Sequence, residues 1–550
     1  MVKRNYVISN KYYDSVMLMK LAGELGRSDG VGQLTVGMGT PLNKDTMNDL
    51  GLLLREGQEA GPNDLVIAVE AESDTVAEEL RNTYLSRLKE TRGTGKNEFA
   101  SLDIMGRYVK DRNLAVISLA GNFAGVEAKK ALCMGMNVFM FSDNVPIERE
   151  IELKEYARDH GLLMMGPDCG LSFINGVAVG LCSKVRRGRI GIAAACGSGM
   201  QEVMNIVHRS GYGISQAIGV GGRDLQDAVG GITMLQSIDI LESDTQTAVI
   251  VLISKPPQPK TIVKILARVR ACKKPVVLQL INADLKELDL GNAVVSATFE
   301  ETANIAIALS EGRSYSSPGE DQKYESVVEL ARKEAEKMSR GQRYLRGIYC
   351  GGSLAEETLT LAQSKLGHIY GNIAFSKEYI LADPNVSVKD CVIDIGAEEF
   401  TIGRPHVAID PAPRIDRFLQ EARDPETAVI LMDFLLGYAL CEDPAGMMTD
   451  AIKRGKAEAE AQGRHLCVIA SICGSDLDPQ NFDIQKKKLE DGIEGQINYM
   501  WDEYEITLSD AAGLRNEEMN DLPAMKREIS GLKDEIRKLG NVNVNAIEDY

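Results

Sequence analysis

Short apolar runs followed by polar, glycine-containing turns recur along most of the chain. Leu114–Leu119, Met136–Phe141 and Leu162–Met165 are runs of strand length, and helical patterns alternate with them. This rhythm of strand, turn and helix is typical of a parallel sheet with polar turns at the carboxyl ends of its strands. The sequence therefore predicts an α/β fold with several doubly wound parallel sheets, Rossmann-like and flavodoxin-like, and a helical C-terminal tail.

The 550-residue chain is too long for a single core, so several domains are expected. Apolar residues at alternating spacings of three and four over 522–539 predict an amphipathic or coiled-coil helix in the tail. The predicted segments are a Rossmann-like, degenerate CoA-binding-like domain (1–184), a flavodoxin-like domain of the CoA-ligase α type (185–312), a charged linker (313–345), a second flavodoxin-like domain of the CoA-ligase β type (346–490) and the helical tail (491–550).

Two segments share a more specific pattern, in which an apolar strand runs into a glycine-serine turn that opens a helix. They are Arg189–Glu202 and Gly347–Glu357. Free amides and the positive end of a helix dipole would hold a phosphate or carboxylate there without a lysine. An ordinary tight turn is the alternative for either one alone. The predicted phosphate-binding residues are Gly197, Ser198, Gly199 and Met200 in the first turn and Gly351, Gly352 and Ser353 in the second.

Two other turns carry candidate catalytic and substrate-binding residues. Arg223 follows glycines at the end of a predicted strand, where its guanidinium would grip a carboxylate or phosphate through two hydrogen bonds. Gly221, Gly222 and Asp224 are predicted to contact the substrate beside it. A turn with a surface arginine is the alternative.

The segment Gly403–Asp410 brings Arg404 and His406 near Asp410 in the sequence. A histidine beside a carboxylate can act as a general acid or base, and an arginine can orient an anionic substrate. We therefore predict catalytic roles for His406, Arg404 and Arg223 and a substrate contact for Asp410. An exposed histidine in a loop is the alternative. Cys196, at a predicted helix N-terminus, is expected to have a lowered pKa.

Charge and cysteine usage exclude several classes of protein. The formal charge of −18 argues against a nucleic-acid surface, which needs clustered Lys and Arg. The apolar runs are too short to cross a membrane, and the N-terminus lacks the apolar core of a secretory signal. Ten cysteines without a C-x-x-C pair predict a reducing, cytoplasmic location and no metal site.

Several motifs together resemble the FdrA-like proteins, which are relatives of the succinyl-CoA synthetase α subunit fused to a domain like the carboxyl end of the β subunit. In the synthetases, two facing helix N-termini hold a phosphate that shuttles on a histidine. The resemblance covers about residues 1–490 and rests on FSDNV (141–145), MGPDCG (165–170), GSG (197–199), GVGGRDL (219–225), SKPP (254–257), GGSL (351–354) and GRPH (403–406).

The sequence departs from the synthetases at the phosphorylated histidine. No histidine occurs between His208 and His368, the ATP-grasp half is absent, and the turn at 37–40 is a degenerate coenzyme A turn. A phosphate site at two helix N-termini, without the histidine that carries the phosphoryl group, fits direct transfer from an acyl phosphate. The resemblance implies a carbamoyltransferase subunit that interconverts oxalurate plus phosphate with oxamate plus carbamoyl phosphate in anaerobic allantoin breakdown.

The implied ligands are phosphate or carbamoyl phosphate, and binding of coenzyme A stays open. The implied partners are other subunits of a hetero-oligomer, with no nucleic acid or membrane. An NDP-forming acyl-CoA ligase and a non-catalytic anion-binding scaffold are the alternatives. The tail from about Gly492 resembles the coiled coil of a structural-maintenance-of-chromosomes protein, without its ATP-binding segments, so no DNA function follows.

Overall fold

The computed structural model describes residues 1–481 with gaps at 10–12, 14, 63, 92–98, 100, 284, 286–287, 317–324 and 402–404. Beyond residue 481 it describes only 486, 493, 497, 499–501, 506 and 507. The chain divides into a unit of residues 1–481 and a second unit of residues 482–550. The predicted helix at 522–539 lies outside the described residues, so the fold below is that of the first unit.

The N-terminal region is an antiparallel sheet, which differs from the predicted parallel one. Its order is β1-β3-β2, and β3 pairs antiparallel with both neighbours. The apolar pattern marks each strand but does not encode the direction of its partner. The Gly37–Thr40 turn joins β2 to α2, and Thr40 caps that helix. The elements are β1 (Val2–Ile8), α1 (Ser15–Leu25), β2 (Val31–Met38), α2 (Pro41–Asp49), α3 (Arg55–Glu59), β3 (Leu65–Ala71) and α4 (Asp74–Thr91).

A second sheet has the predicted parallel arrangement. Its strands lie in the order β4-β5-β6, and each pair is parallel. Apolar residues of β5 and of the flanking helices α6 and α7 form one buried cluster. The elements are α5 (Leu102–Tyr108), β4 (Leu114–Ile117), α6 (Gly121–Cys133), β5 (Asn137–Met140), α7 (Ile147–Asp159) and β6 (Met164–Met165).

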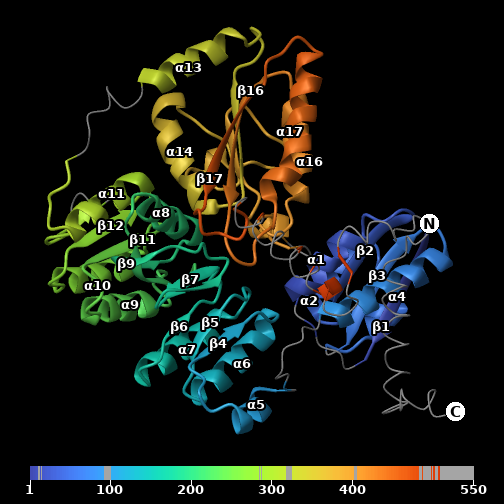
Figure 1. Ribbon diagram of the computed structural model, residues 1–550, viewed down its shortest axis with the longest axis horizontal. Helices are drawn as coiled ribbons and strands as arrows, with labels where there is room; N and C mark the ends of the chain where they lie inside the picture. The colour runs from blue at the N-terminus through green and yellow to red at the C-terminus, as the bar shows by residue number, and fades with distance from the viewer. Residues whose placement is uncertain are drawn as a thin grey trace. The chain divides into compact units, whose positions relative to one another are not determined.

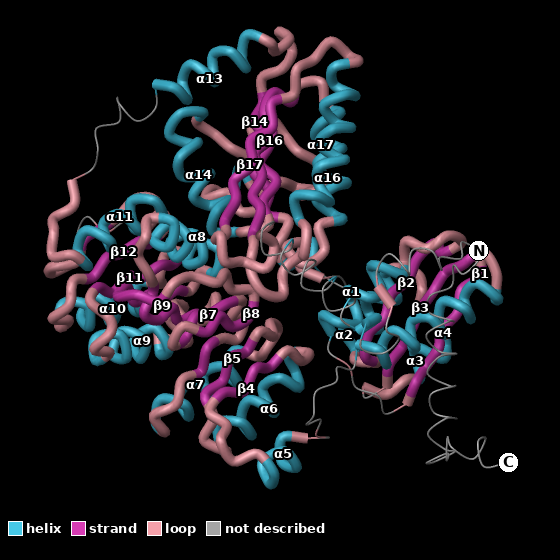
Figure 2. The backbone as a smooth tube through the Cα atoms, viewed as in Figure 1, coloured by secondary structure: helices cyan, strands magenta, loops and turns pink. Residues whose placement is uncertain are grey.

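The third sheet has seven strands in the order β13-β12-β11-β9-β10-β7-β8. The strands from β9 to β13 are parallel, whereas β7 pairs antiparallel with β10 and β8. Helices cover both faces, α8 and α11 on one and α9 and α10 on the other (Figures 1 and 2). The elements are β7 (Leu171–Ile174), β8 (Val177–Gly180), β9 (Arg187–Ala194), α8 (Gly197–Arg209), β10 (Ile214–Gly219), α9 (Ile232–Ser243), β11 (Val249–Ser254), α10 (Pro259–Arg270), β12 (Val276–Leu280), β13 (Val294–Val295) and α11 (Phe299–Ser310).

The fourth sheet is entirely parallel, in the order β15-β14-β16-β17. Together with the third sheet it confirms the predicted α/β fold with several parallel sheets. The elements are α13 (Glu325–Glu336), β14 (Tyr344–Tyr349), α14 (Gly352–Leu366), η1 (Lys377–Tyr379), β15 (Cys391–Asp394), α15 (Glu398–Thr401), α16 (Ala412–Arg423), β16 (Thr427–Leu435), α17 (Pro444–Glu460) and β17 (Cys467–Cys473).

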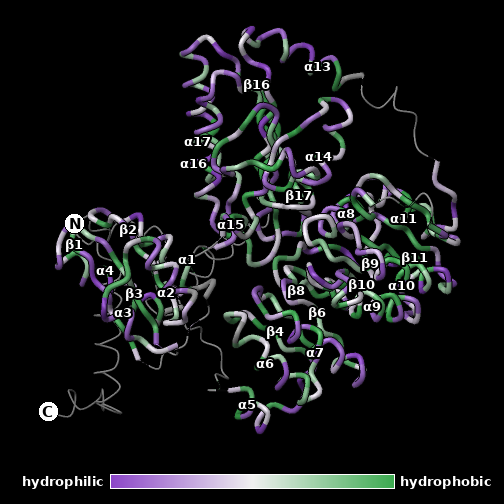
Figure 3. Tube along the Cα trace, turned by 180° about the vertical axis from the view of Figure 1, so that it is seen from behind, coloured by the Kyte–Doolittle hydropathy of each residue, from purple (hydrophilic) through white to green (hydrophobic). Residues whose placement is uncertain are grey.

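One hydrophobic cluster joins the third and fourth sheets. It contains Met200 and Val203 of α8 together with Leu354, Ala355 and Leu359 of α14. Strands β9 and β11 contribute apolar residues to the same cluster, and Figure 3 shows their hydrophobic stretches. Because burial of apolar surface is the main favourable term in folding, this shared core fixes α8 against α14. Among the described residues, no helix is long and apolar enough to cross a membrane.

Candidate functional site

The first predicted anion turn lies at the carboxyl edge of the third sheet. Strand β9 ends at Ala194, and α8 begins at Gly197. No acceptor is found among the described residues for the amides of Gly197, Ser198 and Gly199. This is the usual state of the first turn of a helix, whose N–H groups have no partner within the helix. The first turn of α8 therefore has three amide donors without an acceptor among the described residues.

Met200 is a correction to the predicted phosphate-binding set. Its amide donates to the carbonyl oxygen of Cys196 at 3.2 Å, and its side chain is fully buried in the core. Cys196 is also corrected, because burial raises the pKa of its thiol to about 12. Desolvation outweighs the helix N-terminus at this position, so Cys196 is not a thiolate near neutral pH.

The second predicted turn is partly occupied by a side chain of its own domain. The amides of Cys350 and Gly351 each donate to the carboxylate of Asp433 at 2.8 Å. Arg414 pairs with that carboxylate at 3.1 Å, and both side chains are buried. Gly351 therefore has no free amide for a phosphate, which corrects its predicted role. No acceptor among the described residues is found for the amide of Gly352.

The two turns meet although they lie in different sheets. The amide of Ser353 donates to Oγ of Ser198 at 3.2 Å. A Cβ atom added to Gly351 would lie 2.8 Å from Cβ of Ser198, closer than real Cβ atoms come to other heavy atoms. Glycine is therefore needed at 351 for the approach of the two domains. The structure thus brings the N-termini of α8 and α14 together.

A lysine and two carboxylates, none of them predicted, lie around this junction. Lys255 follows β11, and its Nζ lies 2.6 Å from Oε1 of Glu356 on α14. The other oxygen of Glu356, Oε2, is buried and has no hydrogen-bond partner among the described residues. Asp394 ends β15 and accepts a hydrogen bond from the amide of Gly396 at 2.9 Å. Burial raises the pKa of Asp394 to about 7.

The sequence carried a signal for only one of these groups. Lys255 lies directly after an apolar strand, within the SKPP motif, at the same sheet edge as Gly197. Glu356 and Asp394 had no such signal, because acidic residues are common in helices and turns. Glu357, next to Glu356, accepts a hydrogen bond from the amide of Phe299 at 2.7 Å, and burial raises its pKa to about 7.

The residues of the Gly219–Asp224 turn are largely engaged in structural contacts. Asp224 is fully buried and accepts hydrogen bonds from the amides of Thr233 and Met234 and from Nζ of Lys154. Its carboxylate caps α9 and is not open to a substrate, which corrects its predicted role. Gly221, with φ of +93°, and Gly222 approach the backbone of Pro167 and the carboxylate of Asp168, respectively.

Arg223 is already bonded within its own part of the fold. It pairs with the buried carboxylate of Glu150 at 2.8 Å and donates to the carbonyl oxygen of Val145 at 2.7 Å. Its side chain is 34% exposed, so one face is accessible. The structure does not place it at the junction of α8 and α14 through any contact among the described residues. A substrate contact for Arg223 stays a prediction.

The three residues predicted in the segment Gly403–Asp410 have different outcomes in the structure. Arg404 lies outside the described residues. Nδ1 of His406 accepts a hydrogen bond from the amide of Ala408 at 3.2 Å, and burial lowers the pKa of the imidazole. The carboxylate of Asp410 instead bonds the amide of Ala412 and pairs with Arg27 at 3.0 Å. Asp410 therefore does not act on the His406 ring as predicted, because its carboxylate is turned to Arg27.

His406 nevertheless lies beside the fourth-sheet part of the junction. Its Nε2 would be 2.6 Å from a Cβ atom at Gly396, the residue whose amide bonds Asp394. Since Nδ1 accepts a hydrogen bond, the proton of the neutral ring is on Nε2, which faces this turn. General acid or base catalysis by His406 stays a prediction.

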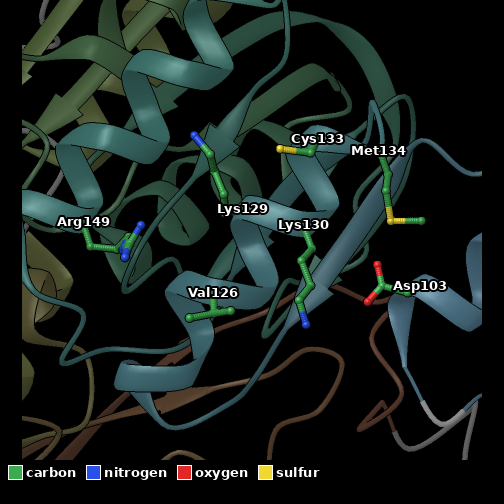
Figure 4. A pocket seen from close by; sticks show the side chains of 7 residues that line it. All are labelled: Asp103, Val126, Lys129, Lys130, Cys133, Met134 and Arg149. Atoms are coloured by element: carbon green, nitrogen blue, oxygen red, sulfur yellow. The ribbon is translucent and has the colours of Figure 1, made fainter.

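A cavity of about 350 Å³ lies elsewhere, among α5, α6 and α7 (Figure 4). Each of its basic side chains already has an acidic partner, because Lys129 and Arg149 share Glu152 and Lys130 pairs with Glu127. Among the described residues, no group of three or more His, Cys, Asp or Glu side chains is placed to hold a metal ion.

Three family models match parts of this chain. A CoA binding domain matches residues 186–278, and a CoA-ligase domain matches residues 348–498. The first match contains β9 and α8, and the second contains the end of β14 and all of α14, so each covers one half of the junction. The CoA binding domain match therefore falls on the third sheet, and the degenerate CoA-binding-like domain expected over 1–184 stays a prediction.

The third model, the heavy metal-associated domain of AllF, matches residues 1–101. That stretch contains no cysteine and no histidine, since the first of each in the sequence are Cys133 and His160. Thiolate and imidazole are the ligands that hold soft and borderline metal ions in proteins. The residues present do not fit a heavy-metal site, so we assign none.

Relatives are found in several organisms. The uncharacterised protein YahF of Escherichia coli (strain K12) is 41% identical over 484 residues, covering 88% of this chain and 93% of YahF. The α subunit of ADP-forming succinate–CoA ligase from Methanothermobacter thermautotrophicus is 25% identical over 173 residues, 30% of this chain and 58% of the subunit. The apo structure of dinucleotide forming acetyl-coenzyme A synthetase 1 from Ca. Korarchaeum cryptofilum aligns with 72% of this chain and 82% of its own, with 16% identity and a TM-score of 0.31.

The identity to YahF extends over nearly the whole of both proteins, and the domain matches relate the two halves of the junction to CoA ligases. The chain therefore belongs to the same family as YahF, an FdrA-like family related to the CoA ligases.

Proposed function

We propose that the chain is an enzyme subunit that holds the phosphoryl group of an acyl phosphate between the N-termini of α8 and α14. The hydrogen bond between Ser353 and Ser198 is the observation that carries the proposal, because it places both helix ends at one point. The open amides of Gly197, Ser198, Gly199 and Gly352 lie at these ends. Helix N-termini bind phosphate through such amides and the helix dipole.

The chemistry that suits this cradle is acyl transfer with phosphate as the leaving group. A nucleophile forms a bond to the acyl carbon, the carbon–oxygen bond to the phosphoryl group breaks, and the electron pair leaves with the phosphate. The proton of the nucleophile is released to a base or to solvent. Amides fixed around the phosphate would stabilise the charge that develops on it.

The comparisons favour an NDP-forming acyl-CoA ligase, in which the nucleophile is the thiol of coenzyme A. The CoA binding and CoA-ligase matches and the succinate–CoA ligase relative support this choice. Coenzyme A would then meet the acyl phosphate near the start of α8, within the 186–278 match.

Carbamoyl transfer is the second candidate, with the amide nitrogen of oxamate as the nucleophile. It is supported by the lack of any histidine between His208 and His368, which removes the phosphate carrier of the ligases from the segment after β12. Partner subunits of a hetero-oligomer would supply the rest of such an active site. His406 lies beside Gly396 of the fourth-sheet turn, and its imidazole would accept the proton that the nucleophile loses.

The full chain is tested first for binding of inorganic phosphate by isothermal titration calorimetry. It is then incubated with succinyl phosphate and coenzyme A, and separately with carbamoyl phosphate and oxamate. Thioester formation supports the ligase, and oxalurate formation supports the carbamoyltransferase. Phosphate binding without turnover of either pair in the presence of co-purified partners favours the scaffold alternative. A chain that does not bind phosphate overturns the whole proposal.

A further inference from the structure

The helix ends cannot by themselves balance the charge of a phosphate dianion. Each helix N-terminus carries the equivalent of roughly half a positive charge, so two of them offset about one of the two negative charges. The surroundings are acidic as well, since the buried carboxyl groups of Glu356 and Asp394 lie beside the junction. A cation is therefore needed close to the phosphate.

Lys255 is suited to this task by position and by freedom to move. It follows β11, which pairs with β9 and so ends at the same sheet edge as α8 begins. Its side chain is 53% exposed, whereas the Glu356 carboxylate that it contacts is only 10% exposed. Arg414, in contrast, is buried and is bonded to Asp433 and to the carbonyl oxygen of Ile348. Arg414 is therefore fixed by its partners, whereas the ammonium group of Lys255 has further N–H donors available for a ligand.

Glu356 requires the ligand to carry a hydrogen-bond donor. Its Oε1 is paired with Lys255, but its buried Oε2 has no hydrogen-bond partner among the described residues. An unpaired buried carboxylate oxygen costs free energy until a donor reaches it. Hydrogen phosphate carries one O–H group and can supply that donor, whereas sulfate at neutral pH has no O–H group.

We propose that the Lys255–Glu356 pair recognises hydrogen phosphate, with Lys255 binding an anionic oxygen and Oε2 of Glu356 accepting the O–H group. The inference rests on the proposed function, because it places the anion at the junction of α8 and α14. It goes further by making the site selective for phosphate over sulfate. Lys255, which follows a strand of the third sheet, then recognises the charge of the anion. Glu356, on a helix that packs with the fourth sheet, recognises the protonation of the same anion.

The test compares inorganic phosphate with inorganic sulfate by isothermal titration calorimetry on the full chain at pH 8. The wild type is expected to bind phosphate at least about 10-fold more tightly than sulfate, as one hydrogen bond to a charged group provides. Lys255→Met is expected to weaken phosphate binding by about 10-fold to 100-fold. Glu356→Gln is expected to tighten sulfate binding and abolish the preference, since its amide can donate to sulfate.

Lys273→Met is the matched control for charge. Lys273 is exposed and precedes β12, at the opposite end of the parallel strands, so the same charge is removed away from the junction. Its phosphate affinity should equal that of the wild type. Melting temperatures verify that all three variants are folded.

The outcomes separate this inference from the function on which it rests. A wild type that binds no phosphate overturns both. A wild type that binds phosphate and sulfate equally, or a Lys255→Met variant with the phosphate affinity of Lys273→Met, overturns only the role of the pair. Retained selectivity in Glu356→Gln overturns the role of Glu356.

Discussion

The amide of Ser353 donates a hydrogen bond to Oγ of Ser198 at 3.2 Å, across 155 positions of the sequence. The bond places the positive ends of two helix dipoles side by side, an arrangement that is unfavourable without nearby negative charge. Asp433, Glu356 and Asp394 provide that charge from the fourth sheet. These carboxylates thus reduce the repulsion between the two helix ends, and they also weaken the positive field that would hold an anion.

We predict that Gly197→Asp weakens phosphate binding without unfolding the protein. Among the described residues, a Cβ atom at 197 would meet only Leu171, at 3.5 Å, so a side chain fits. The new carboxylate would repel the phosphate but interact favourably with the helix dipole, by about 0.3–1 kcal/mol. Calorimetry should show at least a 10-fold weaker affinity and thermal melting an unchanged or higher Tm.

Gly197→Asn is the control, because it has the same shape without the charge. It should keep most of the phosphate affinity. If Gly197→Asp binds phosphate as well as Gly197→Asn does, the anion is not held at the start of α8.

We predict that Gly351→Ala destabilises the protein by about 1–3 kcal/mol, the usual cost of forcing an extra methyl group into a packed contact. Its Cβ would lie 2.8 Å from Cβ of Ser198, so the two domains must separate slightly. Urea unfolding measures the change. Gly341→Ala is the control, since a Cβ atom there meets no described residue within 4 Å. Equal stability of the two variants would show that the close approach is not maintained in solution.

Replacing Arg414 with Met should cost about 3–5 kcal/mol, because it leaves the buried carboxylate of Asp433 without its charge partner. That carboxylate also holds the amides of Cys350 and Gly351, so the second turn should loosen too. The comparison is Arg454→Met, which breaks an exposed pair with Glu458 and should cost less than about 1 kcal/mol. Similar losses in both variants would contradict the structural role of Asp433.

Asp394→Asn should stabilise the protein at pH 8 and change little at pH 4. Burial raises the pKa of Asp394 to about 7, so the folded state keeps a proton that the unfolded state loses near its ordinary value of 3.8. Stability contributed by the protonated form therefore falls as the pH rises from about 4 to about 7. The asparagine removes this loss while its oxygen still accepts from Gly396.

The measurement is the Tm of wild type and variant between pH 4 and pH 8. Asp416→Asn, at an exposed position of α16, is the control and should follow the wild type. A constant difference between Asp394→Asn and wild type across this range would show that Asp394 does not titrate as the structure implies.

Much of the architecture could be predicted from local pattern. The apolar runs that become β9, β11 and β14 are of strand length, and the glycines after β9 and β14 mark where the helices begin. The antiparallel pairing of β1, β2 and β3 was missed, because strand direction depends on how the intervening segments cross and not on the strands themselves.

The residues of the candidate site could be predicted only in part from the sequence. The open amides of Gly197, Ser198 and Gly352 can be expected from the sequence, because a glycine-serine turn after a strand is itself the local signal for them. Phosphate binding by these amides stays a prediction. Asp224 and Gly351 were misassigned, because the groups that occupy them, Met234 and Asp433, come from elsewhere in the chain.

The sequence by itself determined the strands, the helix starts and the two amide-lined turns, since these depend on neighbours a few residues apart. Only the tertiary structure decided that the two turns come into contact and that Lys255 pairs with Glu356. The physical reason is that backbone donors are set by local geometry, whereas charge partners and burial are set by packing between distant segments.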